Sequence, residues 1–339
     1  MKRHANIPIF IPHLGCPNQC VFCNQRTISG VNCFDVTKVD EEISSALSTI
    51  NANIDTEIAF FGGSFTGIGI PLMTHLLEIA YSYVQKGQVT SIRCSTRPDY
   101  INSEILDILK KYGVKTIELG LQSSIDSVLS ASKRGHSFLD EKNACKMIVE
   151  RGFDLVGQMM IGLPGANIDH EIQTAEFIVK SGAKAARIYP TVVFRDTELY
   201  DMAISGKYNP ITLTDAVDRS AKVLEIFENA GVETIRIGLC AQDNLFDEDK
   251  YYAGPNHPAL GELVIGEFIY NKLIDYLSNN AIINDYITIT VPKGMYSKAA
   301  GHKRVNITRL VERFGFSSVT IKESDELFGY EFRIEFERN

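Results

Sequence analysis

One pattern of hydrophobic and polar positions recurs along most of the chain. An amphipathic helical segment ends at a glycine, and a segment rich in aliphatic and β-branched residues follows at once. These glycines are Gly113, Gly152, Gly182 and Gly231. A glycine just past a helix supplies the left-handed residue that closes it. The pattern predicts successive βα units, and Ser103 and Asp140 are the expected caps of the helices before the first two glycines.

Apolar stretches between these helices have the length and composition of buried parallel strands. They span about Ile7–Ile11, Glu57–Phe61, Ser91–Ser95, Thr116–Leu119, Leu155–Ile161, Ala185–Tyr189 and Thr234–Ile237. Strands that alternate with helices in this way predict an α/β fold, here a partial (β/α)6, TIM-like barrel. In such barrels the chemistry lies at the carboxyl ends of the strands.

The last part of the chain has a different pattern. A helical segment, Leu260–Leu277, precedes apolar stretches at Ile287–Val291, Ser317–Ile321 and Phe328–Phe336. This order predicts a small C-terminal α+β domain. We therefore expect a barrel over residues 1–240, a helical connection over 241–284 and a small basic α+β domain over 285–339.

Composition and charge narrow the class of protein. The 339 residues are 45% hydrophobic and 22% charged, as in ordinary globular proteins. We expect neither a signal peptide nor a membrane span, and seven cysteines without a secretory signal indicate a reducing, cytoplasmic compartment. The net charge of −8 is uneven, because residues 293–313 carry six basic residues against one acid. This contrast favours a phosphate-bearing partner.

Three cysteines follow the first predicted strand. Cys16, Cys20 and Cys23 are spaced C-x3-C-x2-C in the run GCPNQCVFCN. Thiolates at this spacing can converge on one metal centre, and on a four-iron cube they leave one iron open to a small molecule. A structural zinc site would need a fourth ligand, normally from a second Cys-x-x-Cys or a His pair, and no such second half is apparent.

Further motifs follow the cysteines in order along the predicted strands. They are Gly62, Gly63 and Ser64 after the second strand, Gln122 and Ser123 after the fourth, and Ile161 before the Gly-Leu-Pro-Gly turn after the fifth. Together these motifs resemble the radical S-adenosylmethionine superfamily, which typically uses a partial (β/α)6 barrel. The run GGSFT and the segment Gln122-Ser123 are similar to the Elongator catalytic subunit group, although we recognise no acetyltransferase domain.

The resemblance implies two cofactors. Cys16, Cys20 and Cys23 would hold a [4Fe–4S] cluster, and one electron from it would cleave S-adenosylmethionine to methionine and a 5′-deoxyadenosyl radical. An electron donor such as flavodoxin or ferredoxin is implied as a partner. The expected S-adenosylmethionine contacts are Phe22, Gly62, Gly63, Ser64, Gln122, Ser123, Gln158, Ile161 and Arg187. Ser64 occupies the position at which the family has a glutamate, so the backbone there, rather than the side chain, would contact S-adenosylmethionine.

Two residues are candidates for roles at the substrate. Arg187 and Tyr189 alternate on one strand and share a face, so Tyr189 is expected to line the substrate cavity. Glu118 would point into the barrel, where a carboxylate needs a partner such as Arg187. His257 is a candidate acid/base or substrate contact, or else a helix-start histidine without a role. For Gln122, Gln158 and Arg187 the alternative is a polar network that fills the barrel.

The C-terminal basic segment loosely resembles the K-homology turn. There a G-x-x-G loop joins two helices and clamps a nucleic-acid backbone. This chain has Gly301, and Arg304 replaces the second glycine. Lys298, Lys303 and Arg304 are the expected RNA-binding residues, and the alternative is a solvated basic helix face.

Three functions remain open from the sequence. The first is a radical enzyme that modifies tRNA or another RNA. The second is an oxidoreductase similar to coproporphyrinogen dehydrogenase that acts on a small molecule, although the fourth cysteine of that group's motif is replaced after Cys23 by Asn24 and Gln25. The third is an RNA-binding protein whose cluster is only structural.

Overall fold

The computed structural model describes residues 4–11, 14–16, 19–24, 34–51, 53–239, 249–282 and 284–336. The chain divides into two compact units. The first unit is Met1–Thr212 with Ile226–Asn256, and the second is Leu213–Glu225 with His257–Asn339. Helix α9 (Leu213–Asn229) begins in the second unit and ends in the first. Within the described ranges no helix is long and apolar enough to cross a membrane.

The first unit is built on one open, curled parallel sheet, with the strand order β1-β2-β3-β4-β5-β6-β8. The strands are β1 (His4–Ile11), β2 (Asp55–Gly62), β3 (Ser91–Thr96), β4 (Val114–Gln122), β5 (Asp154–Ile161), β6 (Ala185–Pro190) and β8 (Glu233–Ile237). All neighbouring strands pair in parallel. Each predicted stretch lies inside the corresponding strand, so the partial barrel is confirmed.

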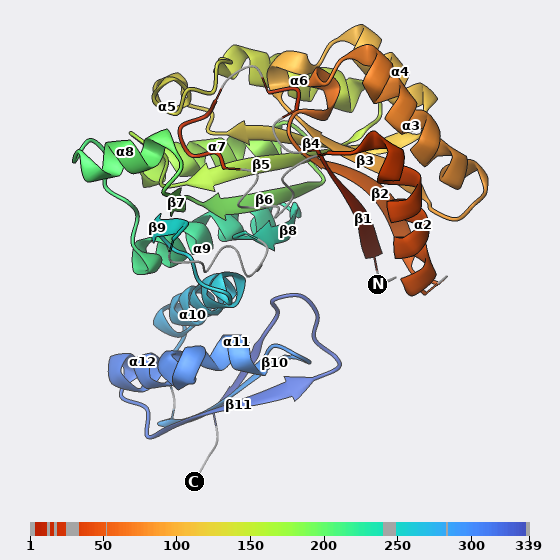
Figure 1. Ribbon diagram of the computed structural model, residues 1–339. Coiled ribbons are helices and arrows are strands. Elements are labelled where there is room, and N and C mark those ends of the chain that lie inside the picture. The colour runs from red at the N-terminus through yellow and green to blue at the C-terminus, as the bar shows by residue number, and fades with distance from the viewer. Residues whose placement is uncertain are drawn as a thin grey trace. The chain divides into compact units, whose positions relative to one another are not determined.

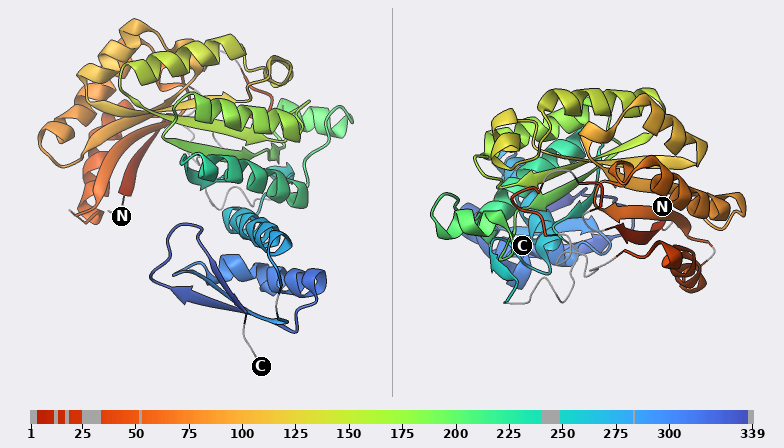
Figure 2. Two further views of the ribbon diagram at one scale, coloured as in Figure 1. Left: turned by 180° about the vertical axis from the view of Figure 1, so that it is seen from behind. Right: turned by 45° about the horizontal axis from the view of Figure 1, so that its top comes forward.

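The helices of the first unit lie along the outer face of this sheet (Figures 1 and 2). They are α2 (Val39–Thr49), α3 (Ile70–Gln85), α4 (Ser103–Lys111), α6 (Phe138–Glu150) and α7 (Ile168–Lys180), with the shorter α5 (Asp126–Ala131) and α8 (Glu198–Ile204) near the strand ends. Two short strands, β7 (Val193–Phe194) and β9 (Tyr251–Ala253), pair with each other. The inner face of the sheet is left for a site.

The helix ends agree with the predicted glycines, but the helix starts do not agree with the predicted caps. The four glycines all have positive φ angles, from 69° at Gly231 to 78° at Gly152. The cap of α4 is Asn102 rather than Ser103, and the cap of α6 is Ser137. The Asp140 carboxylate instead accepts the backbone N–H of Ser137, in a capping box.

The second unit packs helices on a small mixed sheet. Its elements are α10 (Leu260–Asn279), β10 (Tyr286–Pro292), α11 (Tyr296–Ala300), α12 (Val305–Phe314), β11 (Ser318–Ser324) and β12 (Arg333–Phe336). The sheet order is β11-β10-β12, in which β10 is parallel to β11 and antiparallel to β12. The predicted stretch Phe328–Phe336 is a strand only at its end, because the chain turns at Gly329, whose φ is 58°.

Helix α10 belongs to the core of this second unit. Its residues Ile269, Leu273 and Leu277 are buried against Ile289 of the sheet and Leu310 of α12. The expected connection over 241–284 therefore contains a helix that the C-terminal core requires, and the second unit begins earlier than residue 285. The expected boundary at residue 240 lies outside the described residues.

Candidate active site

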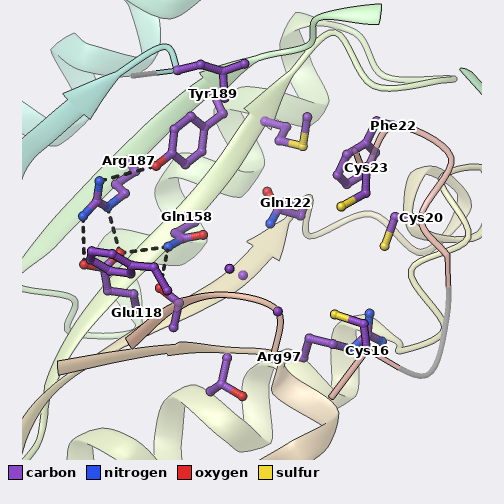
Figure 3. Close-up of a pocket in the computed structure, with 18 of the residues that line it drawn as sticks. Cys16, Cys20, Phe22, Cys23, Arg97, Glu118, Gln122, Gln158, Arg187 and Tyr189 are labelled. Carbon is purple, nitrogen blue, oxygen red and sulfur yellow. Dashed lines mark hydrogen bonds and ion pairs between the residues drawn. The ribbon is translucent and has the colours of Figure 1, made fainter. Parts of the chain in front are cut away.

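A cavity of about 600 Å³ lies in the first unit, on the inner side of the sheet and at the strand ends. The predicted site residues that line it are Cys16, Cys20, Phe22, Cys23, Gly62, Gly63, Gln122, Gln158, Arg187 and Tyr189. Figure 3 shows the three cysteines on one side of this cavity, and Arg187, Tyr189, Gln158 and Glu118 on the other. The fold thus gathers residues from the first, second, fourth, fifth and sixth strands around one space.

Three predicted cofactor contacts lie behind the cavity wall instead. The hydroxyl of Ser64 is buried and forms a hydrogen bond of 2.9 Å with the hydroxyl of Thr96. The hydroxyl of Ser123 accepts the Ile125 N–H at 3.3 Å. Ile161 is fully buried. These residues are not among those that line the cavity.

His257 lies in the second unit, just before α10. Its Nδ1 accepts the backbone N–H of Ala259 at 3.1 Å, and its carbonyl accepts the N–H of Leu260 at 3.1 Å. Both contacts stabilise the start of the helix. His257 is not one of the residues that line the cavity.

Glycines let the cysteine loop lie directly on the end of β2. The Gly63 N–H donates to Ile11 at 2.7 Å, and the Ser64 N–H donates to Leu14 at 3.1 Å. A Cβ atom on Gly63 would lie 2.0 Å from the Leu14 carbonyl oxygen, and one on Gly15 would lie 2.2 Å from the Ser64 carbonyl oxygen. The sequence reasoning assigned Gly62 and Gly63 to the approach of a ligand. The contacts of Gly63 are with the backbone that leads into Cys16.

The other half of the cysteine loop is held by α5 and α8. The Val21 N–H donates to the carbonyl of Ser132, after α5, at 3.2 Å, and the Val21 carbonyl accepts the N–H of Leu199, in α8, at 2.8 Å. Val21 is buried in an apolar cluster with Leu199, and Phe22 packs against that cluster. The loop is therefore fixed at both ends, which sets the directions of its thiols.

The donor set fits an iron–sulfur cluster. Three thiols line one cavity, while in the described part of the chain no three metal-binding side chains approach closely enough to hold a single ion. Three thiols that surround a cavity can each bind one iron of a [4Fe–4S] cluster. Burial raises the pKa of the Cys16 thiol, and the charge of Arg97 opposes this shift.

A buried charge network forms the opposite wall. Glu118 is fully buried, and its carboxylate accepts hydrogen bonds from Arg93, Arg187 and Gln158, each at 2.9 Å. Arg93 also donates to Glu57 at 2.7 Å. The expected Glu118–Arg187 pair is confirmed, and the polar network weighed as an alternative for Gln158 and Arg187 exists. The sequence reasoning missed Arg93 and Glu57, which lie deeper on β3 and β2.

Tyr189 shares the face of Arg187, as expected, and its hydroxyl accepts from Arg187 at 3.4 Å. Burial raises the pKa of the Tyr189 phenol, although the charge of Arg187 opposes the shift. Tyr189 therefore keeps its proton at neutral pH and can donate a hydrogen bond to a molecule in the cavity.

A second polar group lies beside the cysteines. Arg97 donates to Asp99 through two nitrogens at 2.9 and 3.0 Å. Nearby, His136 and Glu141 are buried and lie 3.0 Å apart. Burial lowers the pKa of His136 to about 4 and raises the pKa of Glu141 well above its usual value. Burial therefore disfavours the charged form of both groups.

The cavity wall is strongly cationic. Guanidinium groups of Arg97, Arg134, Arg187 and Arg236 line it, against the carboxylate of Glu118. Among buried atoms without a hydrogen-bond partner in the described chain are Nη1 of Arg97 and Nε of Arg134. Such donors favour an anionic occupant, and a cluster held by three thiolates is one.

Family models match most of the first unit and only the first part of the second. Residues 10–178 match the Radical SAM superfamily, and residues 183–269 match a Radical_SAM C-terminal domain.

Curated relatives point to one group. An uncharacterised protein of Methanocaldococcus jannaschii is 30% identical over 222 residues, which is 62% of this chain and 68% of the relative. Elongator complex protein 3 of Saccharomyces cerevisiae is 30% identical over 44% of this chain, and a tRNA uridine(34) acetyltransferase of Methanocaldococcus infernus is 29% identical over 39%. The chain spans only 27% and 26% of the lengths of these two proteins.

Solved structures share the fold. The archaeal Elp3 of Methanocaldococcus infernus, with its N-terminus deleted, superposes with a TM-score of 0.62 and 21% identity, covering 83% of this chain and 65% of that one. Coproporphyrinogen III oxidase of Escherichia coli, a radical SAM enzyme, gives a TM-score of 0.50 and 15% identity over 68% of this chain and 54% of its own.

Proposed function

Since this chain belongs to the radical S-adenosylmethionine superfamily, in the Elongator-like group, we propose that it is an enzyme that modifies tRNA or another RNA. Its cofactors are a [4Fe–4S] cluster and S-adenosylmethionine. When bound and reduced, they supply a 5′-deoxyadenosyl radical that can remove a hydrogen atom from a substrate. The chain's own residues have to bind both cofactors, exclude water and orient the substrate.

The cysteine side of the cavity is the proposed cluster site, with Cys16, Cys20 and Cys23 as the ligands, and S-adenosylmethionine would reach from there towards the opposite wall. The proposed S-adenosylmethionine contacts on the lining are Phe22, Gly62, Gly63, Gln122, Gln158 and Arg187, and those behind it are Ser64, Ser123 and Ile161. Gln158 and Arg187 already bond to Glu118, so their orientation is fixed before any ligand binds. This preorganisation lowers the free-energy cost of binding.

The opposite side of the cavity is the proposed place for the reacting part of the substrate. Tyr189 would donate a hydrogen bond to it, because the phenol stays protonated there. A role for His257 at the substrate stays a prediction, since its imidazole stabilises the start of α10. Tyr189→Phe removes the donor and retains the ring, so it tests the first role directly.

The proposal that the substrate is RNA rests on one observation. Some basic side chains on the surface of the second unit have no carboxylate partner among the described residues. Lys293 pairs with Asp325 at 3.3 Å, and Arg309 pairs with Glu267 at 2.9 Å. By contrast, Lys298, Lys303 and Arg304 have no carboxylate partner among the described residues. Unpaired cations on a chain of net charge −8 favour a polyanion.

The loop that carries these cations is built to a fixed shape. Gly301 lies between α11 and α12, and Lys303 and Arg304 both take left-handed backbone conformations, with φ of 52° and 63°. Such conformations are uncommon outside glycine and need support from their surroundings. Asn306 gives that support, because its buried side chain donates to the carbonyl of Gly266 in α10 at 2.9 Å.

A pocket of about 310 Å³ adjoins this loop within the second unit. Lys298, Lys303, Arg304, Tyr296 and Glu262 are among the residues that line it. Phosphates on the basic side and a base against the exposed Tyr296 ring would suit a single-stranded nucleotide. The loop joins two helices, as the K-homology resemblance implies.

Partners and location follow as parts of the same proposal. Reduction of the cluster needs a one-electron donor, for which flavodoxin or ferredoxin is suitable, and thiols that must stay reduced suit the cytoplasm.

The proposal is tested by comparing the modified nucleosides of cells with and without the gene. We expect one modified nucleoside in tRNA or another RNA to disappear in the deletion strain and to return with the parent chain. It should not return with a Cys16→Ala, Cys20→Ala, Cys23→Ala variant. Identical nucleoside profiles in total RNA from the two strains would contradict RNA modification.

One observation favours the small-molecule oxidoreductase as a second candidate. The cavity of about 600 Å³ is of the size that encloses a metabolite, and coproporphyrinogen III oxidase shares the fold. Retained cofactor cleavage without RNA binding would favour this candidate. RNA binding without cofactor cleavage would instead favour the third function, a binding protein with a structural cluster.

A further inference from the structure

The turn after α5 contacts the cysteine loop through a buried arginine as well as through its backbone. Besides the hydrogen bond from Val21 to Ser132, Arg134 donates from Nη1 to the Sγ atom of Cys20 at 3.2 Å. Its Nη2 donates to the carbonyl of Gly120 in β4. One side chain therefore links a barrel strand, the α5 turn and a predicted cluster ligand.

Arg134 is held by the backbone around it rather than by a carboxylate. It is only 6% exposed, its N–H donates to the Leu129 carbonyl at 3.0 Å, and Arg97 donates to its carbonyl. Throughout the described segments no aspartate or glutamate forms an ion pair with its guanidinium, and its Nε is buried without a partner. A guanidinium keeps its charge in proteins, and a buried charge is costly unless an opposite charge compensates it.

The compensating charge lies on the cysteine side of the cavity. Arg134 lines the same cavity as Cys16, Cys20 and Cys23, and its contact there is with a sulfur atom. A cysteine bound to iron is a thiolate, which accepts a charge-assisted hydrogen bond. The arrangement leaves Arg134 well satisfied only when an anionic centre occupies the cysteine loop.

We infer that Arg134 is a positioning residue of the cluster, which holds the Cys20 sulfur and stabilises the reduced state. In reduction one electron passes from a one-electron donor to the cluster, whose charge becomes more negative by one. Arg134 gains and loses no proton, and no bond to it forms or breaks. Because hydrogen bonds and positive charge at the sulfurs favour the more negative state, they raise the reduction potential.

The chain offers a matched control in the adjacent residue. Lys133 carries the same charge in the same turn, but its ammonium is exposed and lies 2.7 Å from Glu198 on α8. Lys133→Met therefore removes one positive charge without removing a contact to Cys20. Arg134→Lys retains the charge of Arg134 but loses its two-pronged geometry.

The experiment is a redox titration of the anaerobically reconstituted full-length protein, followed by electron paramagnetic resonance of the reduced cluster. In Arg134→Met we expect the equilibrium constant for reduction to fall about tenfold, which is 59 mV for one electron. Arg134→Lys should fall between this variant and the parent, and Lys133→Met should match the parent. A fully loaded Arg134→Met protein with the parent's potential would overturn the inference.

A second measurement does not depend on whether the variants load iron. The parent protein is labelled with ¹⁵N-arginine, and pulsed resonance of its reduced cluster is searched for a nitrogen coupling. We expect a coupling that Arg134→Lys lacks. A parent spectrum without any arginine coupling would overturn the inference even if every Arg134 variant failed to bind iron. Neither measurement involves RNA, so failure of the proposed function would leave this result intact.

Discussion

The two cationic regions of this chain differ in what neutralises them. In the barrel, Arg93 and Arg187 are tied to the fully buried Glu118 by hydrogen bonds of 2.9 Å. In the second unit, Lys303 and Arg304 are exposed and have no carboxylate partner within the described residues. Buried charges that are fixed by the protein suit a small occupant that must be held in one orientation. Exposed charges suit a long polyanion that binds and leaves.

The two regions should therefore respond to different perturbations. Barrel charges are shielded from salt, and removing one leaves its partners buried and unpaired. Charges on the second unit interact through solvent, so added salt should weaken them while the fold persists. The variants below test this contrast, beginning with the largest expected effect.

Removal of the three cysteines should prevent binding of the iron–sulfur cluster, which is the anion that we expect in the barrel cavity. We expect the Cys16→Ala, Cys20→Ala, Cys23→Ala variant to bind no cluster after anaerobic reconstitution, because the three thiolates proposed to hold the irons would be missing. Iron and sulfide analysis measures the result. Cys145→Ala is the control, since Cys145 is buried on α6, and it should load like the parent. Full iron loading of the triple variant would contradict the site.

Glu118→Gln should strongly destabilise the first unit, because it leaves Arg93 and Arg187 with less compensating charge in the barrel. Removing one partner of a buried ion pair costs about 3–5 kcal/mol of unfolding free energy. The chain has no tryptophan, so urea unfolding is followed by far-ultraviolet circular dichroism.

Glu198→Gln is the matched control for that measurement. Glu198 pairs with Lys133 at the surface at 2.7 Å, and exposed pairs contribute at most about 1 kcal/mol. If the Glu118 and Glu198 variants unfolded at the same urea concentration, the buried network would not be the stabilising unit that its geometry indicates.

The basic loop should govern RNA binding through salt-dependent phosphate contacts. Replacing Lys298, Lys303 and Arg304 with alanine should reduce the slope of log K against log salt by about 0.7 for each lost contact on single strands. Binding should weaken for most sequences alike, and cofactor cleavage without substrate should persist. Filter binding of tRNA and of total RNA across a salt series measures the affinity and its slope.

Lys293→Ala is the control, because it removes a charge that Asp325 already neutralises. Its slope should stay near that of the parent. The variant that lacks Lys298, Lys303 and Arg304 could instead bind RNA as tightly as the parent at every salt concentration. The basic loop would then be only a solvated face, and the small-molecule candidate would become the better one.

The sequence predicted most of the fold because the signals are local. Most strands are short segments rich in aliphatic and β-branched residues, and four helices end at glycines whose positive φ no other residue adopts as readily. The helix starts were harder, since Asn102 and Ser103 are adjacent and both able to cap. Only the backbone conformation selects Asn102 over its neighbour.

The candidate site was predicted where motifs mark it and missed where contacts are distant. The cysteines and Gln122 belong to short motifs, and each lines the cavity. Arg134 and Cys20 are 114 positions apart, and nothing in either segment reveals their contact.

The smallest expected effect concerns His136, which burial and the charges of Arg134 and Arg97 keep neutral. Its pKa is lowered from 6.5 to about 4, so between these values the unfolded chain binds a proton that the folded chain does not. Stability contributed in this way is lost as pH falls. From pH 7.5 to 5.5 the loss attributable to His136 should be about 1 kcal/mol. His136→Gln should remove it, as measured by urea unfolding of iron-free protein at both pH values.

Glu141 also contributes to the pH dependence of the parent's unfolding free energy. The effect of His136 is therefore the difference between His136→Gln and the parent at the two pH values. Its raised pKa means that it stabilises the fold only while protonated, so its contribution is lost as pH rises, opposite in sign to that of His136. The exposed His75→Gln is the control and should keep the parent's pH dependence. If His136→Gln also kept it, His136 would titrate as it does in the unfolded chain. The arginines around His136 would then be more hydrated than their burial indicates. That result would weaken the contrast between the buried charges of the barrel and the exposed charges of the second unit.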